Sequence, residues 1–220
     1  PGMNQQTAVD REGFGALMLR LRTQGVAAPA LFGALEATPR RGFVPSQWQE
    51  VSWSDRMIPI ACGEAMEGAD LQASVIAALR IEPGHRVLEV GTGSGFTAAI
   101  MARMAARVVT VERFRTLADD ARRRLEALGI FNVFVKHADG SAGSPPDAPF
   151  DRIVVWAAFD SLPRTFSDQL ATNGIMIAPI GPAEGEQELA KLSKIGSRFD
   201  REDIGHVRFQ PIMRGVAAAL

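Results

Sequence analysis

The stretch LEVGTGSGFTAAI, residues 88–100, joins a short apolar run to a helix-like segment through three glycines, Gly91, Gly93 and Gly95. This order is typical of a buried parallel strand that turns directly into a helix. Open parallel sheets bind ligands at the carboxyl ends of their strands, and glycine lets a ligand approach the backbone without a clash with a Cβ atom. The stretch predicts a ligand-binding loop, although a tight turn without a ligand has the same local pattern.

The strand and helix pattern continues beyond this loop. Short apolar runs at 86–90, 107–111, 132–136 and 151–157 indicate buried parallel strands, and helical patterns cover 95–106 and 116–129. Such alternation predicts an α/β fold with a doubly wound, mainly parallel sheet. Two more strands are predicted, at 174–180 and at 206–212, where the sheet ends. Residues 187–195 fit either a strand or a helix.

The first eighty residues have a different pattern, in which helical periodicity takes the place of the short apolar runs typical of buried strands. Apolar positions recur at helical spacing over 10–24, 29–38 and 70–81, with Asp70 as the expected N-cap of the third helix. Residues 40–64 mix prolines, tryptophans and polar residues without a period, which indicates an irregular segment. Because no linker separates these helices from the sheet, we expect a single domain over 1–220. Residues 3–80 would form a helical cap with a substrate-side segment, and residues 81–220 the α/β core.

Composition limits the classes of partner and cofactor. The 220 residues are 46% hydrophobic, enough for a full core, and the net charge of -1 gives no electrostatic footprint for nucleic acid or an anionic membrane. A single cysteine excludes an internal disulfide, and the three histidines lack metal-ligand spacing, so no metal is expected. Without an apolar run long enough to cross a bilayer and without a signal peptide pattern, the chain is predicted to be cytoplasmic.

Three acidic residues indicate which ligand the glycine loop holds. Glu112 follows the second strand, 21 residues after Gly91, where a carboxylate can accept both hydroxyls of a ribose. Asp139 follows the third strand, in position to meet an adenine. Glu89, two residues before Gly91, would repel a pyrophosphate but tolerate the ammonium of a methionine moiety. Phe96 stands where a dinucleotide loop requires glycine. These features favour S-adenosylmethionine over a nicotinamide cofactor, which remains an alternative.

The chain resembles the protein-L-isoaspartate O-methyltransferases over nearly its whole length. The segments that carry the resemblance are RVLEVGTGSGFTAAIMARM (86–104), VVTVER (108–113), HADGSAG (137–143), APFDRIVVWAA (148–158) and HVRFQPI (206–212), with TPRRGFVP (38–45) and MIPI (57–60) upstream. The resemblance implies a class I, Rossmann-like methyltransferase fold. It also implies that S-adenosylmethionine is used to esterify the carboxylate of isoaspartyl residues, with S-adenosylhomocysteine as product, in the repair of damaged proteins.

The resemblance also assigns residues to the site. Glu89, Gly91, Gly93, Gly95, Glu112 and Asp139 match the family's cofactor residues. GEAMEGADLQ (63–72) aligns with the family's G-Q-T-I-S-Q-P segment: Gly63 is retained, whereas Glu64, Ala65, Glu67 and Ala69 replace glutamine, threonine, serine and proline. Trp156 and Phe159 stand where the family tends to carry threonine and alanine. The hydroxyl pair that the family uses against its substrate is therefore missing.

These departures leave two functions open. The first is methylation of a protein or peptide carboxylate, isoaspartyl or related, with Arg208 as the best candidate to meet that carboxylate; a surface salt bridge is the alternative for this arginine. The second is a homologue that binds the cofactor but has lost isoaspartyl activity, and acts as a binding protein or on another substrate. No catalytic base is identified, and methyl transfer to an ionised oxygen needs alignment and desolvation more than a base.

Overall fold

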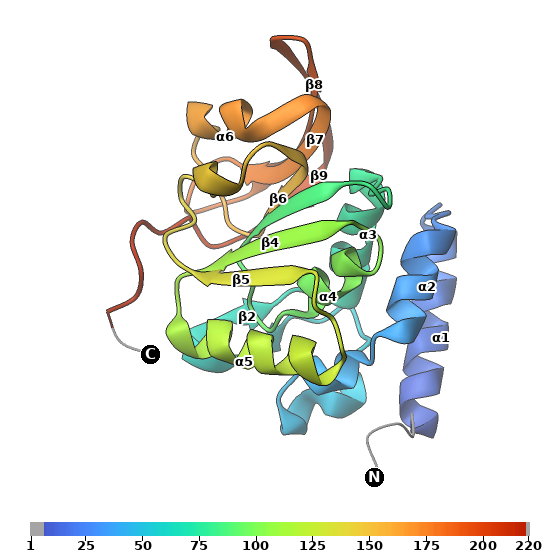
Figure 1. Ribbon diagram of the computed structural model, residues 1–220. Helices are drawn as coiled ribbons and strands as arrows, with labels where there is room; N and C mark the ends of the chain where they lie inside the picture. Colours follow the sequence, from blue (N-terminus) through green and yellow to red (C-terminus); the bar gives the residue numbers. More distant parts are fainter. Residues whose placement is uncertain (1–6, 219–220) are drawn as a thin grey trace.

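A seven-stranded sheet forms the centre of the protein, of which the computed structural model describes residues 7–218 (Figure 1). The strands lie in the order β5-β4-β3-β6-β7-β8-β9. Neighbours from β5 to β7 pair in parallel, whereas β8 pairs antiparallel with β7 and β9. Their bounds are β3 Arg86–Val90, β4 Arg107–Glu112, β5 Val133–His137, β6 Phe150–Val155, β7 Leu170–Ile180, β8 Gln187–Ile195 and β9 Arg198–Val207. The predicted mainly parallel α/β sheet is confirmed.

The helices cover the two faces of this sheet unequally. They are α1 Ala8–Thr23, α2 Pro29–Ala37, α3 Ala69–Leu79, α4 Phe96–Ala102, α5 Arg115–Ala127 and α6 Arg164–Gln169. Successive residues of a strand point to opposite faces, so Val87 joins the core beneath α3 and α4 while Leu88 joins a second core that includes Phe166 of α6. The first core is the larger and contains the residues that the N-terminal helices bury.

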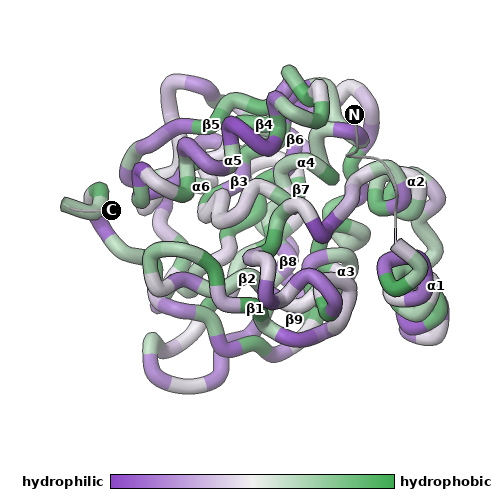
Figure 2. The backbone as a smooth tube through the Cα atoms, turned by 90° about the horizontal axis from the view of Figure 1, so that it is seen from below, coloured by the Kyte–Doolittle hydropathy of each residue, from purple (hydrophilic) through white to green (hydrophobic). Residues whose placement is uncertain are grey.

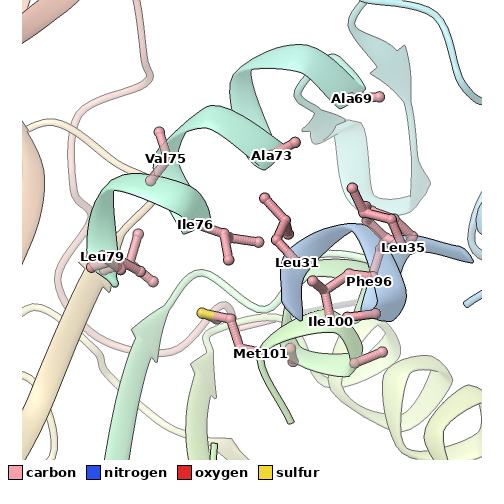
Figure 3. Packing of buried hydrophobic residues seen from close by; sticks show 14 of the residues in the cluster. Leu31, Leu35, Ala69, Ala73, Val75, Ile76, Leu79, Phe96, Ile100 and Met101 are labelled. Atoms are coloured by element: carbon pink, nitrogen blue, oxygen red, sulfur yellow. The ribbon is translucent and has the colours of Figure 1, made fainter. Parts of the chain in front are cut away.

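Apolar side chains tie the N-terminal helices to the sheet. Leu31 and Leu35 of α2 meet Phe96 and Ile100 of α4 and Ile76 of α3 (Figure 3). Helix α1 stands at the edge of the molecule and alternates hydrophilic and hydrophobic residues along its length (Figure 2). It buries Leu17 and Leu21, and Thr7 and Asp10 form a capping box at its start. One continuous core therefore joins the cap to the α/β region.

The segment between α2 and α3 is irregular, as predicted. It contains three short 3₁₀ helices, η1 Arg40–Phe43, η2 Ser46–Val51 and η3 Ala61–Gly63, and a small antiparallel hairpin of β1 Ile58–Pro59 and β2 Ala65–Met66. A fourth 3₁₀ helix, η4 Pro145–Asp147, precedes β6. The segment holds its place by packing, since the buried ring of Trp53 contacts both Phe14 and Phe96 edge to face.

Two predicted boundaries are wrong. Helix α3 begins at Ala69 with Gly68 as its N-cap, and Asp70 instead uses its carboxylate to pair with Arg20 at 2.8 Å. Residues 206–212 do not form the last strand, because β9 ends at Val207 and the chain then leaves the sheet. The sequence contains no clear signal for β9, because this strand lies at the edge of the sheet, where a mostly polar run is permitted. The ambiguous segment 187–195 is strand β8.

The described residues give no indication of a membrane-spanning segment. None of the helices between residues 7 and 218 is both long enough and apolar enough to cross a bilayer.

Candidate functional site

A cavity of about 390 Å³ opens at the carboxyl ends of β3 and β4, within the size range of small-molecule sites. Three parts of the chain line it. The strand ends and the loops after them contribute Val90, Gly91, Val111, Glu112, Arg113, Phe114, Gly140, Trp156 and Ala157. The hairpin region contributes Met57, Gly63, Glu64, Ala65 and Glu67, and the C-terminal segment contributes residues 208–213. A larger cavity of about 990 Å³, beside η1 and α5, contains none of the predicted site residues.

The glycine loop has the backbone that its sequence requires. Gly91, Gly93 and Gly95 have φ values of 97°, 54° and 92°, in the left-handed region that favours glycine. Gly91 lines the cavity. Gly95 serves packing instead, because a Cβ atom there would lie 3.0 Å from the Cβ of Ala121 on α5. The loop thus exposes backbone to the cavity at its start and brings two helices together at its end.

Glu112 joins the loop to the end of β4. Its Oε1 accepts a hydrogen bond from the Gly93 amide and its Oε2 accepts one from the Phe114 amide, both at 3.0 Å. Burial raises the pKa of this carboxyl, and the two amide donors oppose that shift. A carboxylate has about four acceptor sites, so these two bonds leave capacity for a ligand that enters the cavity.

Glu89 does not line the cavity. It is fully buried, and its carboxylate accepts hydrogen bonds from Thr97 Oγ1 at 2.5 Å, Thr110 Oγ1 at 2.8 Å and Trp156 Nε1 at 2.9 Å. Burial raises its pKa to about 7, and the three donors oppose this. Since Trp156 does line the cavity, Glu89 acts on the cavity wall through that indole ring. The parallel register of β3 and β4 places Thr110 directly beside Glu89.

Two further predicted residues lie away from the cavity. Phe159 is buried in the core against Phe166, with ring centroids 5.2 Å apart, so its bulk does not fill the cavity. Its amide donates to the carbonyl of Pro179, which turns this residue toward β7. Asp139 is exposed and accepts a hydrogen bond from the Ser141 amide, while its neighbour Gly140 lines the cavity. Although burial raises the pKa of Asp139, hydrogen bonds from Ser141 and Gly215 lower it overall.

The hairpin side of the cavity depends on Arg40, which the sequence did not single out. This guanidinium is fully buried and donates to the side chain of Gln72 at 2.6 Å, to the carbonyl of Glu67 at 2.9 Å and to the carbonyl of Ser52. Burial lowers its pKa to about 9. It also lies 4.5 Å from the centre of the Phe96 ring. Arg40 thereby fixes the backbone from which the Glu67 side chain projects.

The C-terminal segment reaches the cavity by returning to the sheet. The amide of Ala158 donates to the carbonyl of Gln210, and the amide of Ile212 donates to the carbonyl of Ala158. Gln187 fixes Phe209 by accepting a hydrogen bond from its amide at 2.8 Å. Arg208, predicted within a strand, lies instead on this segment and lines the cavity with an exposed side chain. The pattern VRFQPI contained one signal against a regular strand here, Pro211, which has no amide hydrogen to donate to a strand ladder.

Comparison with known proteins agrees with this architecture. The family model described as protein-L-isoaspartate(D-aspartate) O-methyltransferase matches residues 13–217. The chain belongs to this family. A relative from Rhizobium meliloti named protein-L-isoaspartate O-methyltransferase is 48% identical over 93% of this chain and 100% of its own length. One of the same name from Parvibaculum lavamentivorans is 41% identical over 98% of this chain and 99% of its own.

Solved structures give the same fold. A protein-L-isoaspartate O-methyltransferase with 28% identity superposes with a TM-score of 0.78, covering 90% of this chain and 65% of that chain. A putative enzyme of this kind from Plasmodium falciparum, in complex with S-adenosyl-L-homocysteine, gives a TM-score of 0.75 at 23% identity, covering 90% of this chain and 97% of its own. The class I methyltransferase architecture expected for the family is therefore confirmed.

The cavity of this family member fits S-adenosylmethionine as its cofactor. Gly91 offers backbone without a side chain, and a Cβ there would already lie 3.4 Å from the Cβ of Trp156. Glu112 lies in the cavity wall with acceptor capacity left for a ribose. Among residues 7–218, no group of three or more histidine, cysteine, aspartate or glutamate side chains is arranged to hold a metal ion.

Proposed function

We propose that this protein transfers a methyl group from S-adenosylmethionine to the carboxylate of an isoaspartyl residue, or a closely related carboxylate, in a protein or peptide. One observation carries the proposal: a single cavity is lined by Gly91 of the glycine loop and Glu112, and also by residues of the 57–67 region and Arg208. A reaction between a cofactor and a second substrate requires both to occupy one space. The names of the relatives supply the acceptor class.

The cofactor would lie against the loop after β3. We assign Gly91 and the rest of the glycine loop to its methionine end, Glu112 to its ribose and Asp139 to its adenine end. Glu89 would contribute through Trp156, whose indole it orients. When bound, S-adenosylmethionine supplies a methyl group on a cationic sulfur and becomes S-adenosylhomocysteine on losing it.

The protein residues would orient and desolvate the acceptor. An ionised carboxylate is already a nucleophile, so no general base is required. Arg208 carries a positive charge into the cavity wall and has no hydrogen bond or ion pair with any residue in the range 7–218, which leaves it available to a carboxylate. Such a charge-assisted bond stabilises binding by about 1.5–3 kcal/mol.

We also propose that residues 3–80 and 81–220 act as one domain, supported by the core that joins them. The proposed reaction would serve the repair of damaged proteins in the cytoplasm. A single cysteine, which cannot form an internal disulfide, suits a reducing compartment.

The proposal is tested by incubating the protein with labelled S-adenosylmethionine and either an isoaspartyl peptide or its aspartyl twin. Calorimetry with S-adenosylhomocysteine on the same preparation measures cofactor binding. Transfer to the isoaspartyl peptide alone is the expected result. Cofactor binding without transfer to either peptide would instead support the second function, a homologue that has lost isoaspartyl activity. The replacement of the hydroxyl pair by Ala65 and Glu67 favours this second function.

A further inference from the structure

We propose that Glu67 makes the protein select acceptors that carry a positively charged group beside the carboxylate to be methylated. This inference rests on the function proposed above and adds to it the chemical class of the acceptor. It concerns a residue of this chain that stands where the family carries a serine, so the family's name does not supply it.

The first argument is that the side chain of Glu67 has no partner among the described residues. Its side chain is half-buried and lines the cavity, and it makes no hydrogen bond or ion pair with any residue from 7 to 218. Arg208 lines the same cavity with the opposite charge, yet no ion pair joins the two side chains. A half-buried carboxylate without a partner is costly, so a ligand that brings a cation to it gains binding energy.

The second argument is that the backbone at this position is fixed. Arg40 donates from its buried guanidinium to the carbonyl of Glu67 at 2.9 Å. The next residue, Gly68, lies so close to Asp55 that a Cβ atom there would come within 2.2 Å of the Asp55 carbonyl oxygen. The Glu67 carboxylate therefore cannot leave the cavity by a shift of its backbone without breaking these contacts.

The third argument is the charge of the surroundings. The charged groups that face the cavity with Glu67 are two acids, Glu64 and Glu112, and two bases, Arg113 and Arg208, and Arg40 lies behind it. Burial raises the pKa of Glu67 to about 7. A cation on the acceptor would favour the ionised form, whereas an acidic neighbour would face up to three carboxylates. The carboxylate of Glu67 would therefore favour basic over acidic acceptors.

The test compares isoaspartyl peptides that differ only in the residue after the isoaspartyl position, which is lysine, glutamine or glutamate. At pH 8 we expect kcat/KM to be at least tenfold higher for the lysine peptide than for the glutamate peptide, mainly through KM. In Glu67→Gln, which keeps the size of the side chain, this preference should fall to about twofold. Glu64→Gln is the matched control, since Glu64 is a half-buried acid that lines the same cavity, whereas it is the backbone of Glu67 that Arg40 holds. This variant should retain most of the preference.

The pH dependence gives a second readout. Because Glu67 ionises as the pH rises through about 7, the preference for lysine should be smaller at pH 6 than at pH 8 in the natural protein. The lysine itself, with a pKa of about 10.4, remains charged throughout. In Glu67→Gln the remaining preference should not change between these two pH values.

Binding separates failure of this inference from failure of the proposed reaction. Calorimetry of the same peptides is done on protein saturated with S-adenosylhomocysteine, where no turnover occurs. Tighter binding of the lysine peptide without methyl transfer would support the inference and contradict the proposed function. Equal treatment of the lysine and glutamate peptides, or a preference unaltered in Glu67→Gln, would overturn the inference while leaving the function intact. Absence of binding by every peptide would overturn both.

Discussion

The two walls of the cavity are built in different ways. The wall formed by Gly91 and Glu112 consists of the ends of β3 and β4, which lie inside the sheet and pair with neighbours along their length. The opposite wall, formed by Gly63, Ala65 and Glu67, consists of a hairpin of two-residue strands and the residues beside it. The wall that we assign to the cofactor, the cofactor wall, is thus a product of the fold itself. The wall that we assign to the acceptor, the acceptor wall, is a small appended structure.

Each wall nevertheless depends on one fully buried charged residue. Glu89 accepts three side-chain hydrogen bonds behind the cofactor wall, and Arg40 donates three hydrogen bonds behind the acceptor wall. Burial favours the neutral form of both side chains: it raises the pKa of Glu89 to about 7 and lowers the pKa of Arg40 to about 9. The comparison teaches that side chains of the acceptor wall, such as those of Ala65 and Glu67, can differ without loss of the two buried anchors behind the cavity.

The largest effect should come from removing the anchor of the acceptor wall. Arg40→Met leaves the acceptor groups of Ser52, Glu67 and Gln72 without their buried donor, so we expect the free energy of unfolding to fall by about 3 kcal/mol or more. Urea denaturation measures this. Arg41→Met is the matched control, because within residues 7–218 the Arg41 side chain makes only a long contact of 3.4 Å, with Asp10, and its removal should cost less than about 1 kcal/mol. Equal losses of unfolding free energy in the two variants would contradict the role of Arg40 as a buried anchor.

Glu89, the anchor of the cofactor wall, should make the free energy of unfolding depend on pH. In the folded protein the pKa of Glu89 is about 7, above its ordinary value of 4.5, so the folded state binds the proton more tightly. Its contribution to stability is complete below about pH 4.5 and is lost as the pH rises through 7. Between pH 5.5 and pH 8 the free energy of unfolding should therefore fall by about 2 kcal/mol more in the natural protein than in Glu89→Gln. Parallel pH profiles for the two proteins would contradict this.

Removal of the Glu112 carboxylate from the cofactor wall should weaken cofactor binding. Glu112→Ala deletes the proposed ribose acceptor and also releases the amides of Gly93 and Phe114. We expect the Kd for S-adenosylhomocysteine to rise at least tenfold, which corresponds to about 1.4 kcal/mol, as measured by calorimetry. Glu64→Ala, which removes an acid from the opposite wall of the same cavity, should change it less than threefold. A folded Glu112→Ala variant with unaltered affinity would refute the assignment.

The smallest effect is expected from restoring a hydroxyl to the acceptor wall. Ala65 is exposed within β2 and lines the cavity, so Ala65→Thr adds a donor in a place that can accommodate it. One net hydrogen bond of about 1 kcal/mol should lower the KM for an isoaspartyl peptide about fivefold, with the cofactor affinity unchanged. Ala61→Thr, outside the cavity lining, is the control. No change in KM would mean that the acceptor does not approach this side of the hairpin.

The sequence by itself determined the elements whose signals are local. The strand, the glycine loop and helix α4 are contiguous, so LEVGTGSGFTAAI was enough to predict the loop, and the spacing from Gly91 to Glu112 was enough to bring both to the carboxyl edge of the sheet. Backbone conformation and strand order along a βαβ unit follow from residues close in the chain. The resemblance to the family then supplied the cofactor and the class of reaction.

The tertiary structure alone decided which side chains face the cavity. Phe159 faces the core because its backbone bonds to β7, and Glu89 is enclosed because Thr97, Thr110 and Trp156 come together around it. Arg208 reaches the cavity because the chain leaves the sheet after Val207 and bonds to Ala158. In each case the deciding contacts join residues far apart in sequence, and a local pattern fixes the period of a strand but not its surroundings.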